Sequence, residues 1–520
     1  MFSDTTHIHH FLENSTRLYP EKHAVVDGNR RATYSNINEM ANRFATHCRQ
    51  MGIGAGNRIV LFLENSIEYI AAYYGILKAG AAAVPLNTYS SPSTLSQLIP
   101  HIEPSMIVTN IKHLSALQEA EIDCQSLQHF VVIGPMSFPL PEGHVWKWDD
   151  FLTEGENSNP LVSEDSSALA SIIFTSGSSG KPKGVMLSHE NIVHNTSSIC
   201  QYLSLTEKDI QMVVLPFTYV MGKSLLNTHF AVGGRIIINN QFAYPANVLK
   251  QMVDERVTGF SGVPSTYAHL LHRSPLIEYR DKLVYLRYCS QAGGHMPRQT
   301  KIELRKALPE HTEIFVMYGA TEASARLSYL RPDKYMSKID SIGQEIPGVV
   351  LRVVDMNGED LPAGKTGELI ASGKNIMRGY WKDPLGTAKV LSPLGYKTGD
   401  MAYKDVDGYF FITGRHDNLL KVNGFRVNPE EVEDALLATG LIVEAAVIGI
   451  PDPLMDHKLL ALTVPKHTQT VELQILQAAT RLLDRHKWPE QVILTRDLPK
   501  NHNGKIDRNK CLKLVMSHID

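Results

Sequence analysis

Two kinds of apolar segment alternate along the N-terminal part of the chain. Short apolar runs such as IVLFL at 59–63 predict strands, and the longer stretch at 66–79 has the spacing of a helix. The same alternation predicts further strands at 82–86, 106–109 and 129–133. Because strands separated by helices usually pair in parallel, the pattern predicts a mostly parallel sheet with helices on both faces.

A second run of this kind begins near Ser167. It predicts strands at 170–174, 185–187 and 283–288, and Ser188 is placed to cap the helix that follows the second of them. The predicted fold class is therefore α/β, with two α/β subdomains in one large N-terminal domain.

The pattern changes near residue 349. Strand-like runs flank Asn357-Gly358, a pair that favours a tight hairpin turn, and this predicts a small β-rich subdomain at about 345–414. Taken together, these segments make up a predicted N-terminal domain of residues 1–416.

Beyond this point the chain has a compact α+β pattern. It predicts a helix at 429–437, strands at 445–450 and 460–465, a second helix at 473–485, and a last strand at 492–495. We therefore expect a small, mobile C-terminal domain of residues 417–520.

Composition narrows the class of protein. The 520 residues are too many for one simple core, and 43% hydrophobic residues with a formal charge of -3 are typical of a globular protein without nucleic-acid partners. The most apolar stretch is interrupted by Glu68, Lys78 and Pro85, so no membrane span is predicted. Five cysteines without a CxxC pair, and an N-terminus unlike a signal peptide, favour a cytoplasmic location.

A glycine-rich segment, TSGSSGKPKGV, follows the predicted strand at 170–174. Glycines let backbone N–H groups approach an anion, hydroxyls add donors, and Lys183 adds positive charge, so the segment is suited to a triphosphate. It is not a Walker A loop, because Pro182 stands where that motif needs Ser or Thr.

The segment resembles the signature loop of the adenylate-forming superfamily, which includes acyl- and aryl-CoA synthetases, non-ribosomal peptide adenylation domains and luciferases. Further motifs follow in order along nearly the whole chain, and the resemblance is nearest to the acyl-CoA synthetase type. It implies that ATP phosphates are held by Thr175, Ser176, Gly177, Ser178, Ser179, Gly180 and Lys183.

Two motifs resemble the family's adenine and metal sites. In the YGxTE-like stretch, the resemblance and side-chain chemistry assign Tyr318 to adenine stacking, Thr321 to a phosphate and Glu322 to Mg²⁺. Gly319 of the same stretch is also expected to contact the nucleotide, and Ala292 and Gly293 would line the adenine and acyl sites.

Two further motifs resemble the family's ribose site and domain hinge. The resemblance assigns Asp400 to the ribose hydroxyls, Arg415 to the ribose and phosphate, and Asp417 to the hinge between the domains.

The remaining motifs lie in the predicted mobile domain. KVNGFRV resembles the loop that faces the active site during thiol transfer, with Lys421 and Gly424 as its candidate residues. The PKxxxGKIxR-like ending implies that Lys505 is the adenylation lysine. Two anions must react, so Lys505 would bridge the acid and the α-phosphate while Lys183, the loop hydroxyls and Mg²⁺ stabilise the leaving pyrophosphate.

The predicted acyl pocket contains Tyr219, Val220, Met221, Val263 and Gly319. No carboxylate lies near Phe217, which argues against an α-amino acid, and Tyr219 stands where many acyl- and aryl-CoA ligases have His. Lys223 or Arg326 could pair with a second acid group on the substrate. We expect instead that both reach water, as long cationic side chains usually do.

These observations predict an ATP-dependent carboxylic acid–thiol ligase that forms acyl-AMP and then an acyl thioester. Coenzyme A is the favoured acceptor, and the phosphopantetheine of a separate acyl carrier protein, which could take an acyl or amino acid, is the alternative. A luciferase-like oxygenase and a non-catalytic nucleotide-binding module are less favoured. The histidines at 7, 9 and 10 predict a solvated helix start rather than a metal site.

Overall fold

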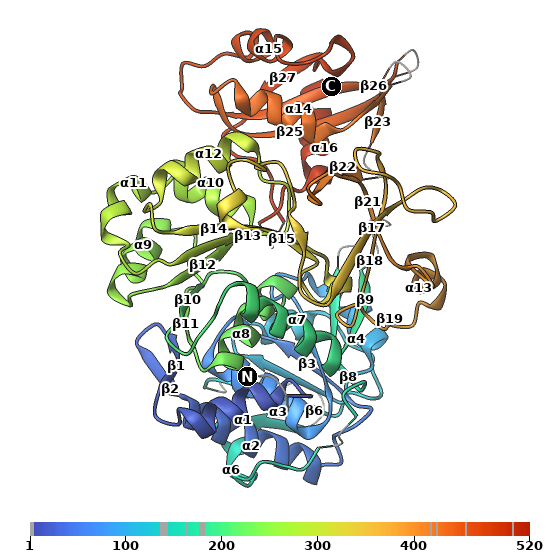
Figure 1. Cartoon of the computed structure of the whole chain (residues 1–520). Helices are drawn as coiled ribbons and strands as arrows, with labels where there is room; N and C mark the ends of the chain where they lie inside the picture. The colour runs from blue at the N-terminus through green and yellow to red at the C-terminus, as the bar shows by residue number, and fades with distance from the viewer. Residues whose placement is uncertain are drawn as a thin grey trace.

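The computed structural model describes residues 5–135, 144–162, 165–175, 182–415, 419–422, 425–452, 455–501 and 504–519. Its two large sheets, its β-rich part and its C-terminal part are visible in Figure 1, where the C-terminal part caps the rest of the chain. The predicted α/β fold class, with a large N-terminal part and a small C-terminal part, is confirmed.

The first large sheet has the order β19-β9-β8-β4-β3-β5-β6-β7. Strands β3 to β8 pair in parallel, whereas β9 is antiparallel to both β8 and β19. Its members are β3 (Arg58–Phe62), β4 (Ala82–Pro85), β5 (Met106–Asn110), β6 (His129–Ile133), β7 (His144–Lys147), β8 (Leu169–Thr175), β9 (Lys183–Ser188) and β19 (Gly379–Tyr380).

The second large sheet has the order β16-β15-β14-β13-β12-β10-β11-β1-β2. Its central strands are parallel, and β2, β15 and β16 add antiparallel edges. Its members are β1 (His23–Asp27), β2 (Arg30–Thr33), β10 (Ile210–Val213), β11 (Arg235–Ile238), β12 (Gly259–Gly262), β13 (Tyr288–Gln291), β14 (Glu313–Tyr318), β15 (Ser328–Leu330) and β16 (Gln344–Glu345).

Helices join the two large sheets. One buried cluster contains Ile59 of β3, Ile236 of β11, Ile192 and Leu225, so it spans both sheets and the helices between them. The predicted cap is present, because Ser188 accepts a hydrogen bond from the N–H of Asn191 at 3.1 Å. The helices of these two subdomains are α1 (His9–Leu18), α2 (Tyr34–Gln50), α3 (Ile67–Ala79), α4 (Pro92–Ile102), α5 (Leu114–Glu119), α6 (Trp148–Thr153), α7 (His189–Tyr202), α8 (Val220–Val232), α9 (Pro245–Asp254), α10 (Pro264–His272), α11 (Leu276–Tyr279) and α12 (Arg298–Ala307).

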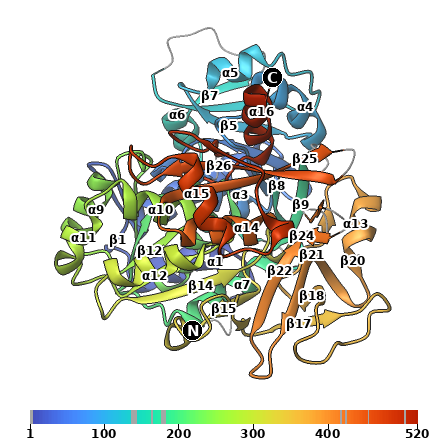
Figure 2. The ribbon, with the colours of Figure 1, turned by 90° about the horizontal axis from the view of Figure 1, so that it is seen from above.

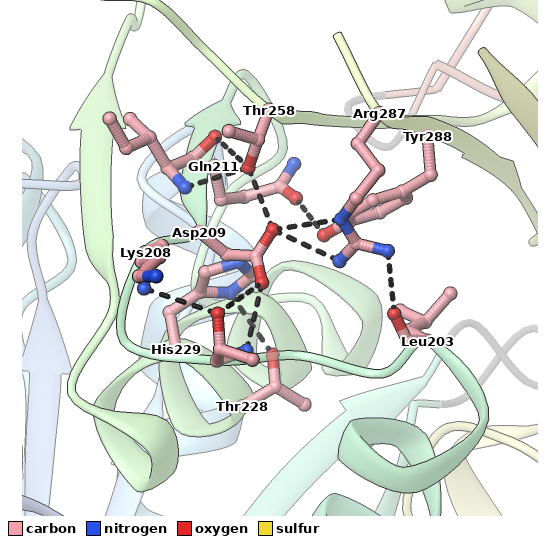
Figure 3. A network of polar contacts seen from close by, with 11 residues as sticks. Leu203, Lys208, Asp209, Gln211, Thr228, His229, Thr258, Arg287 and Tyr288 are labelled. Carbon is pink, nitrogen blue, oxygen red and sulfur yellow. Dashed lines mark hydrogen bonds and ion pairs between the residues drawn. The ribbon is translucent and has the colours of Figure 1, made fainter. Parts of the chain in front are cut away.

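A buried acid ties together the starts of three neighbouring strands (Figure 3). Asp209, Thr258 and Arg287 each lie just before a strand, namely β10, β12 and β13 in that order. Asp209 accepts a hydrogen bond from Thr258 and another from Arg287, each at 2.9 Å. Beside it, Tyr288 donates to Gln211 at 2.7 Å. Because the strands are parallel, fixing their starts also fixes their opposite ends, where the candidate site lies.

The β-rich part contains β17 (Val349–Val354), β18 (Gly367–Gly373), β20 (Leu391–Ser392), β21 (Gly395–Lys404) and β22 (Phe410–Arg415), with α13 (Pro384–Val390) alongside. The hairpin turn predicted at Asn357-Gly358 forms, and Gly358 has a φ of +85°, a left-handed conformation that suits glycine.

The C-terminal part is a smaller α+β unit with a mostly antiparallel sheet. Its strands are β23 (Leu420–Val422), β24 (Phe425–Val427), β25 (Ile442–Asp452), β26 (Asp456–Pro465) and β27 (Gln491–Leu494), and its helices are α14 (Pro429–Ala438), α15 (Glu472–Thr480) and α16 (Arg508–Ile519). Alternate residues of β25 pack into separate clusters on the two faces, Val447 on one and Ala446 on the other. Seen from above, this unit lies over the junction of the other parts (Figure 2).

Two element predictions are wrong. The strand expected at 283–288 begins only at Tyr288, because Leu283 and Leu286 are buried by a turn rather than by a sheet. The helix expected at 473–485 ends at Thr480, and a short 3-10 turn follows at Arg485–Lys487.

Candidate active site

A cavity of about 560 Å³ is lined by residues of both α/β subdomains, the β-rich part and the C-terminal part. Its walls bring together predicted residues that are far apart in the sequence. These are Thr175, Lys183, Tyr219, Gly319, Thr321, Glu322, Asp400, Arg415 and Lys505. The volume is within the usual range for a small-molecule site.

The two ends of the glycine-rich segment lie on adjacent antiparallel strands. Thr175 at the end of β8 pairs with Lys183 at the start of β9, and both residues line the cavity. The predicted loop residues Ser176, Gly177, Ser178, Ser179 and Gly180 lie outside the described residues, so their phosphate role stays a prediction.

Tyr380 is a site residue that the sequence did not indicate. Strand β19 pairs Tyr380 with Val185 of β9, which places its ring beside the glycine-rich segment. The Nζ atom of Lys183 lies 4.8 Å from the centre of this ring. A two-residue strand carries no periodic signal, so only the pairing of β19 with β9 reveals the contact.

Glu322 lies in a short 3-10 helix, Thr321–Ala323, and lines the cavity. Tyr380 donates a hydrogen bond to its Oε1 atom at 2.8 Å. Burial, together with the charge of Glu322, raises the pKa of Tyr380 well above its usual range, so this phenol keeps its proton and remains a donor. Glu322 is therefore held in one orientation.

Gly319 permits the close approach of a second backbone segment at residues 325–326. A Cβ atom on Gly319 would lie 2.0 Å from the carbonyl oxygen of Ala325, far inside van der Waals contact. The glycine thus lets the segment carrying Arg326 pass directly behind the cavity wall.

Asp400 is the centre of a second polar group in the cavity. Tyr318 donates a hydrogen bond to its Oδ2 atom, and Arg415 Nε lies 3.1 Å from its Oδ1 atom. Burial raises the pKa of Asp400 above its ordinary value, although Arg415 and Tyr318 oppose this shift. The arrangement holds an acceptor carboxylate at the cavity, as the predicted ribose role requires.

Lys505 reaches the cavity from the C-terminal part. Its N–H donates to Asn501 Oδ1 at 3.0 Å, and Ser265 donates to the carbonyl oxygen of Gly504, which anchors this turn on the N-terminal part. Lys505 Nζ lies 5.6 Å from the centre of the Tyr219 ring. The predicted lysine and the predicted acyl-pocket aromatic are therefore neighbours.

Gly293 lies under the same two side chains. A Cβ atom there would be 2.7 Å from Tyr219 Oη and 3.6 Å from Lys505 Cε. Val263 is also adjacent, at 3.2 Å from that position. Gly293 and Val263 thus lie next to Tyr219, although neither lines the cavity itself, and their predicted roles stay predictions.

Other predicted residues lie farther from the cavity. Val220, Met221 and Ala292 are buried in the apolar clusters beside Tyr219. Lys421 lies on β23 and forms an ion pair with Asp456 at 3.1 Å. The hinge residue Asp417 and the loop residue Gly424 lie outside the described residues.

Two expectations about charged and histidine side chains are wrong. Lys223 and Arg326 do not reach water, because each residue is 3% exposed. The helix start is not solvated at His7 and His9, which are also buried. His9 packs against the rings of His7, His10 and His189 instead.

Within the described part of the chain, no helix has both the length and the hydrophobicity that crossing a bilayer requires. All five cysteines are free thiols.

Comparison with known proteins identifies the family of the chain. The model of the AMP-binding enzyme family matches residues 12–381, and that of the AMP-binding enzyme C-terminal domain matches residues 431–505. The chain therefore belongs to the AMP-binding enzyme family, and the resemblance seen in the motifs is confirmed.

Individual relatives extend over nearly the whole chain. A putative acyl-CoA synthetase, YngI of Bacillus subtilis, is 29% identical, covering 96% of this chain and 95% of its own. The ATP-bound structure of MatB from Rhodopseudomonas palustris has a TM-score of 0.83 at 26% identity, covering 98% and 99% of the two chains. The anthranilate CoA ligase AuaEII, in complex with anthranoyl-AMP, shares the fold at a TM-score of 0.89 and 24% identity, covering 98% of each chain.

Proposed function

We propose that the chain activates a carboxylic acid with ATP, releasing pyrophosphate, and then transfers the acyl group from AMP to the thiol of coenzyme A. It is an AMP-forming acid–thiol ligase of the acyl-CoA synthetase type. The observation that carries this proposal is the position of Lys505, which shares one cavity with Thr175, Lys183, Glu322 and Asp400.

The first half-reaction joins two anions, so the site must offset their repulsion. In our proposal Lys505 lies between the acid carboxylate and the α-phosphate, and Lys183 contacts the phosphates that leave as pyrophosphate. Asp400 accepts the ribose hydroxyls, and Arg415 contacts the ribose and phosphate. The acid oxygen then attacks phosphorus in line with the departing pyrophosphate.

A Mg²⁺ ion fits the donors present at Glu322. The ion prefers carboxylate and phosphate oxygens, and Glu322 offers a carboxylate in the wall that also contains Thr175 and Lys183. Tyr380 already contacts Oε1, so we assign the other oxygen to the ion. Bound there, the ion would supply positive charge to the pyrophosphate oxygens.

The second half-reaction needs Lys505 to move away from the cavity. The contacts that hold its turn, such as the Ser265–Gly504 hydrogen bond, cross between two parts of the chain and can be broken by a rigid rotation. We propose that the rotation occurs about residue Asp417 and brings the face containing Lys421 and Gly424 to the thiol.

Coenzyme A is proposed as acceptor because the full-length relative YngI is named as an acyl-CoA synthetase, although a putative one. A carrier-protein thiol has the same chemistry and would be a separate partner. Free cysteines in the described structure favour a reducing compartment, and we propose the cytoplasm.

The test is acid-dependent exchange of labelled pyrophosphate into ATP, followed by thioester detection with coenzyme A or a phosphopantetheinylated carrier. We expect exchange with at least one acid and a thioester with coenzyme A. If no acid supported exchange, the ligase assignment would be refuted. If the thioester formed only on the carrier, the carrier thiol would replace coenzyme A as the proposed acceptor.

A further inference from the structure

Arg326 is a buried cation with neutral neighbours. Its Nε atom lies 3.1 Å from Met317 Sδ and its Nη1 atom donates to the carbonyl oxygen of Ala325 at 3.2 Å, while the phenol of Tyr202 lies close by. No Asp or Glu of the described residues is among the groups that influence its pKa, which burial lowers from its usual value. A buried charge without a counter-charge is costly, so this guanidinium needs a partner.

Lys223, the other buried cation near Tyr219, differs in this respect. Its Nζ atom donates to Tyr69 Oη at 2.6 Å and lies 3.8 Å from the centre of the Tyr73 ring. Burial places its pKa well below the usual value, and an ammonium can lose its proton when it is buried. An arginine cannot do so in a protein, and its planar fork suits a carboxylate. Of these two described cations, Arg326 is therefore the one that requires an anionic partner.

Arg326 lies directly behind the wall of the candidate site. A Cβ atom on Gly319, which lines the cavity, would be 2.8 Å from Arg326 Cα. Tyr219 also lines the cavity, and its phenol is close enough to influence the pKa of Arg326. On the cavity side, Lys505 Nζ lies 5.6 Å from the centre of the Tyr219 ring. The two cations thus lie near a single aromatic side chain.

We propose that the acid substrate carries a second anionic group, and that Arg326 binds it. This inference rests on the proposed function, and it assigns a dicarboxylic acid as the substrate. The proximal carboxylate of the acid contacts Lys505. Its distal carboxylate forms a bidentate pair with Arg326 once the Tyr219 ring turns aside. Such a charge-assisted pair would supply the counter-charge that the described residues do not.

The experiment compares dicarboxylic acids with their distal monomethyl esters. The ester keeps the length of the acid and removes the charge of its distal carboxylate. Pyrophosphate exchange is measured for the wild type and for the variants R326M, R326K and K223M. Each variant removes or changes one buried cation, and K223M is the control. The ratio of kcat/KM for acid and ester within one variant cancels any loss of folded protein.

We expect the wild type and K223M to prefer the diacid at least about tenfold, the usual effect of a hydrogen bond to a charged group. R326M should lose that preference, and R326K should retain part of it because a lysine keeps the charge without the fork. If the wild type used the diacid and its ester equally well, or if R326M kept the preference for the diacid, the inference would be overturned and the proposed function would stand. Absence of exchange with every acid overturns the proposed function, and the inference with it.

Discussion

Tyr380 donates a hydrogen bond to Glu322 Oε1 at 2.8 Å, and the two residues come from segments 58 positions apart. The same phenol ring lies 4.8 Å from Lys183 Nζ, so one side chain contacts both the proposed metal ligand and the proposed phosphate-binding lysine. Tyr380 therefore positions two charged groups in the part of the cavity assigned to the leaving pyrophosphate.

The Tyr380→Phe variant tests this positioning role. It keeps the ring beside Lys183 but removes the hydrogen bond to Glu322, and a hydrogen bond to a charged group is worth about 1.5–3 kcal/mol. We expect about a tenfold or greater rise in the Mg²⁺ concentration needed for half-maximal pyrophosphate exchange.

The matched control for this prediction is Tyr89→Phe. Tyr89 is next in sequence to residues that line the same cavity, Asn87 and Ser90, but its own side chain is exposed, at 81%. It should leave the Mg²⁺ dependence unchanged. Equal Mg²⁺ curves for Tyr380→Phe and the wild type would show that the phenol does not position the ligand.

Much of this fold could be predicted from the sequence because its signals are local. The alternation of strands and helices predicted most strands of the first large sheet, namely β3, β4, β5, β6, β8 and β9, and Ser188 caps its helix as its position indicates. Local signals also mislead, since the buried pair Leu283 and Leu286 imitates a strand.

The burial of Arg326 could not be predicted in the same way. The general tendency of long cations to reach water favoured exposure, but the close backbone approach at Gly319 places the arginine behind the cavity wall. Tyr380 was missed for a related reason, because its role depends on a pairing between β19 and β9 across nearly two hundred residues. Both features depend on tertiary contacts that no local pattern contains.

The Lys505→Ala variant separates the two half-reactions. Lys505 reaches the cavity in the arrangement seen here, and the proposed rotation removes it before thiol transfer. We expect acyl-AMP formation to fall by about 10²-fold or more, since a transition-state charge contact is lost. Thioester formation from preformed acyl-AMP should remain close to the wild-type rate.

Single-turnover measurements of each half-reaction check this prediction. Lys421→Ala is the complementary variant, because Lys421 lies away from the cavity and belongs to the face proposed for thiol transfer. Equal losses in both half-reactions for Lys505→Ala would contradict the proposed division of roles.

The Asp400→Asn variant tests the ribose contact. The carboxylate accepts from Tyr318 and pairs with Arg415, so its geometry is fixed before nucleotide binds. An asparagine keeps the shape but offers one acceptor oxygen instead of two. We expect kcat/KM for ATP to fall about tenfold or more, by the loss of charge-assisted hydrogen bonds.

Discrimination against 2′,3′-dideoxy-ATP shows whether that loss concerns the ribose. The wild type should strongly prefer ATP, whereas Asp400→Asn should use the two nucleotides with nearly equal kcat/KM. If the variant kept the full wild-type preference, Asp400 would not contact the ribose hydroxyls.

A histidine–aspartate pair links the two proposed domains and should make the first half-reaction depend on pH. His295 Nε2 lies 2.9 Å from both carboxylate oxygens of Asp434 in α14. Desolvation disfavours the charged imidazole, but Asp434 and Glu430 outweigh it and raise the pKa of His295 above its ordinary 6.5. Contact between the domains is thus strongest below this raised pKa and weakens as the pH rises through it.

Measurement of pyrophosphate exchange against pH, for the wild type and His295→Gln, checks this prediction. Exchange requires Lys505 in the cavity, so at low pH the wild type should exchange about two- to fivefold faster than the variant, the size expected of a solvent-accessible ion pair. This advantage should disappear as the pH rises. Asp434→Asn should reproduce the variant's profile, because either change removes the pair. A wild-type to variant ratio that stays constant with pH would mean that protonation of His295 does not stabilise the arrangement in which acyl-AMP forms.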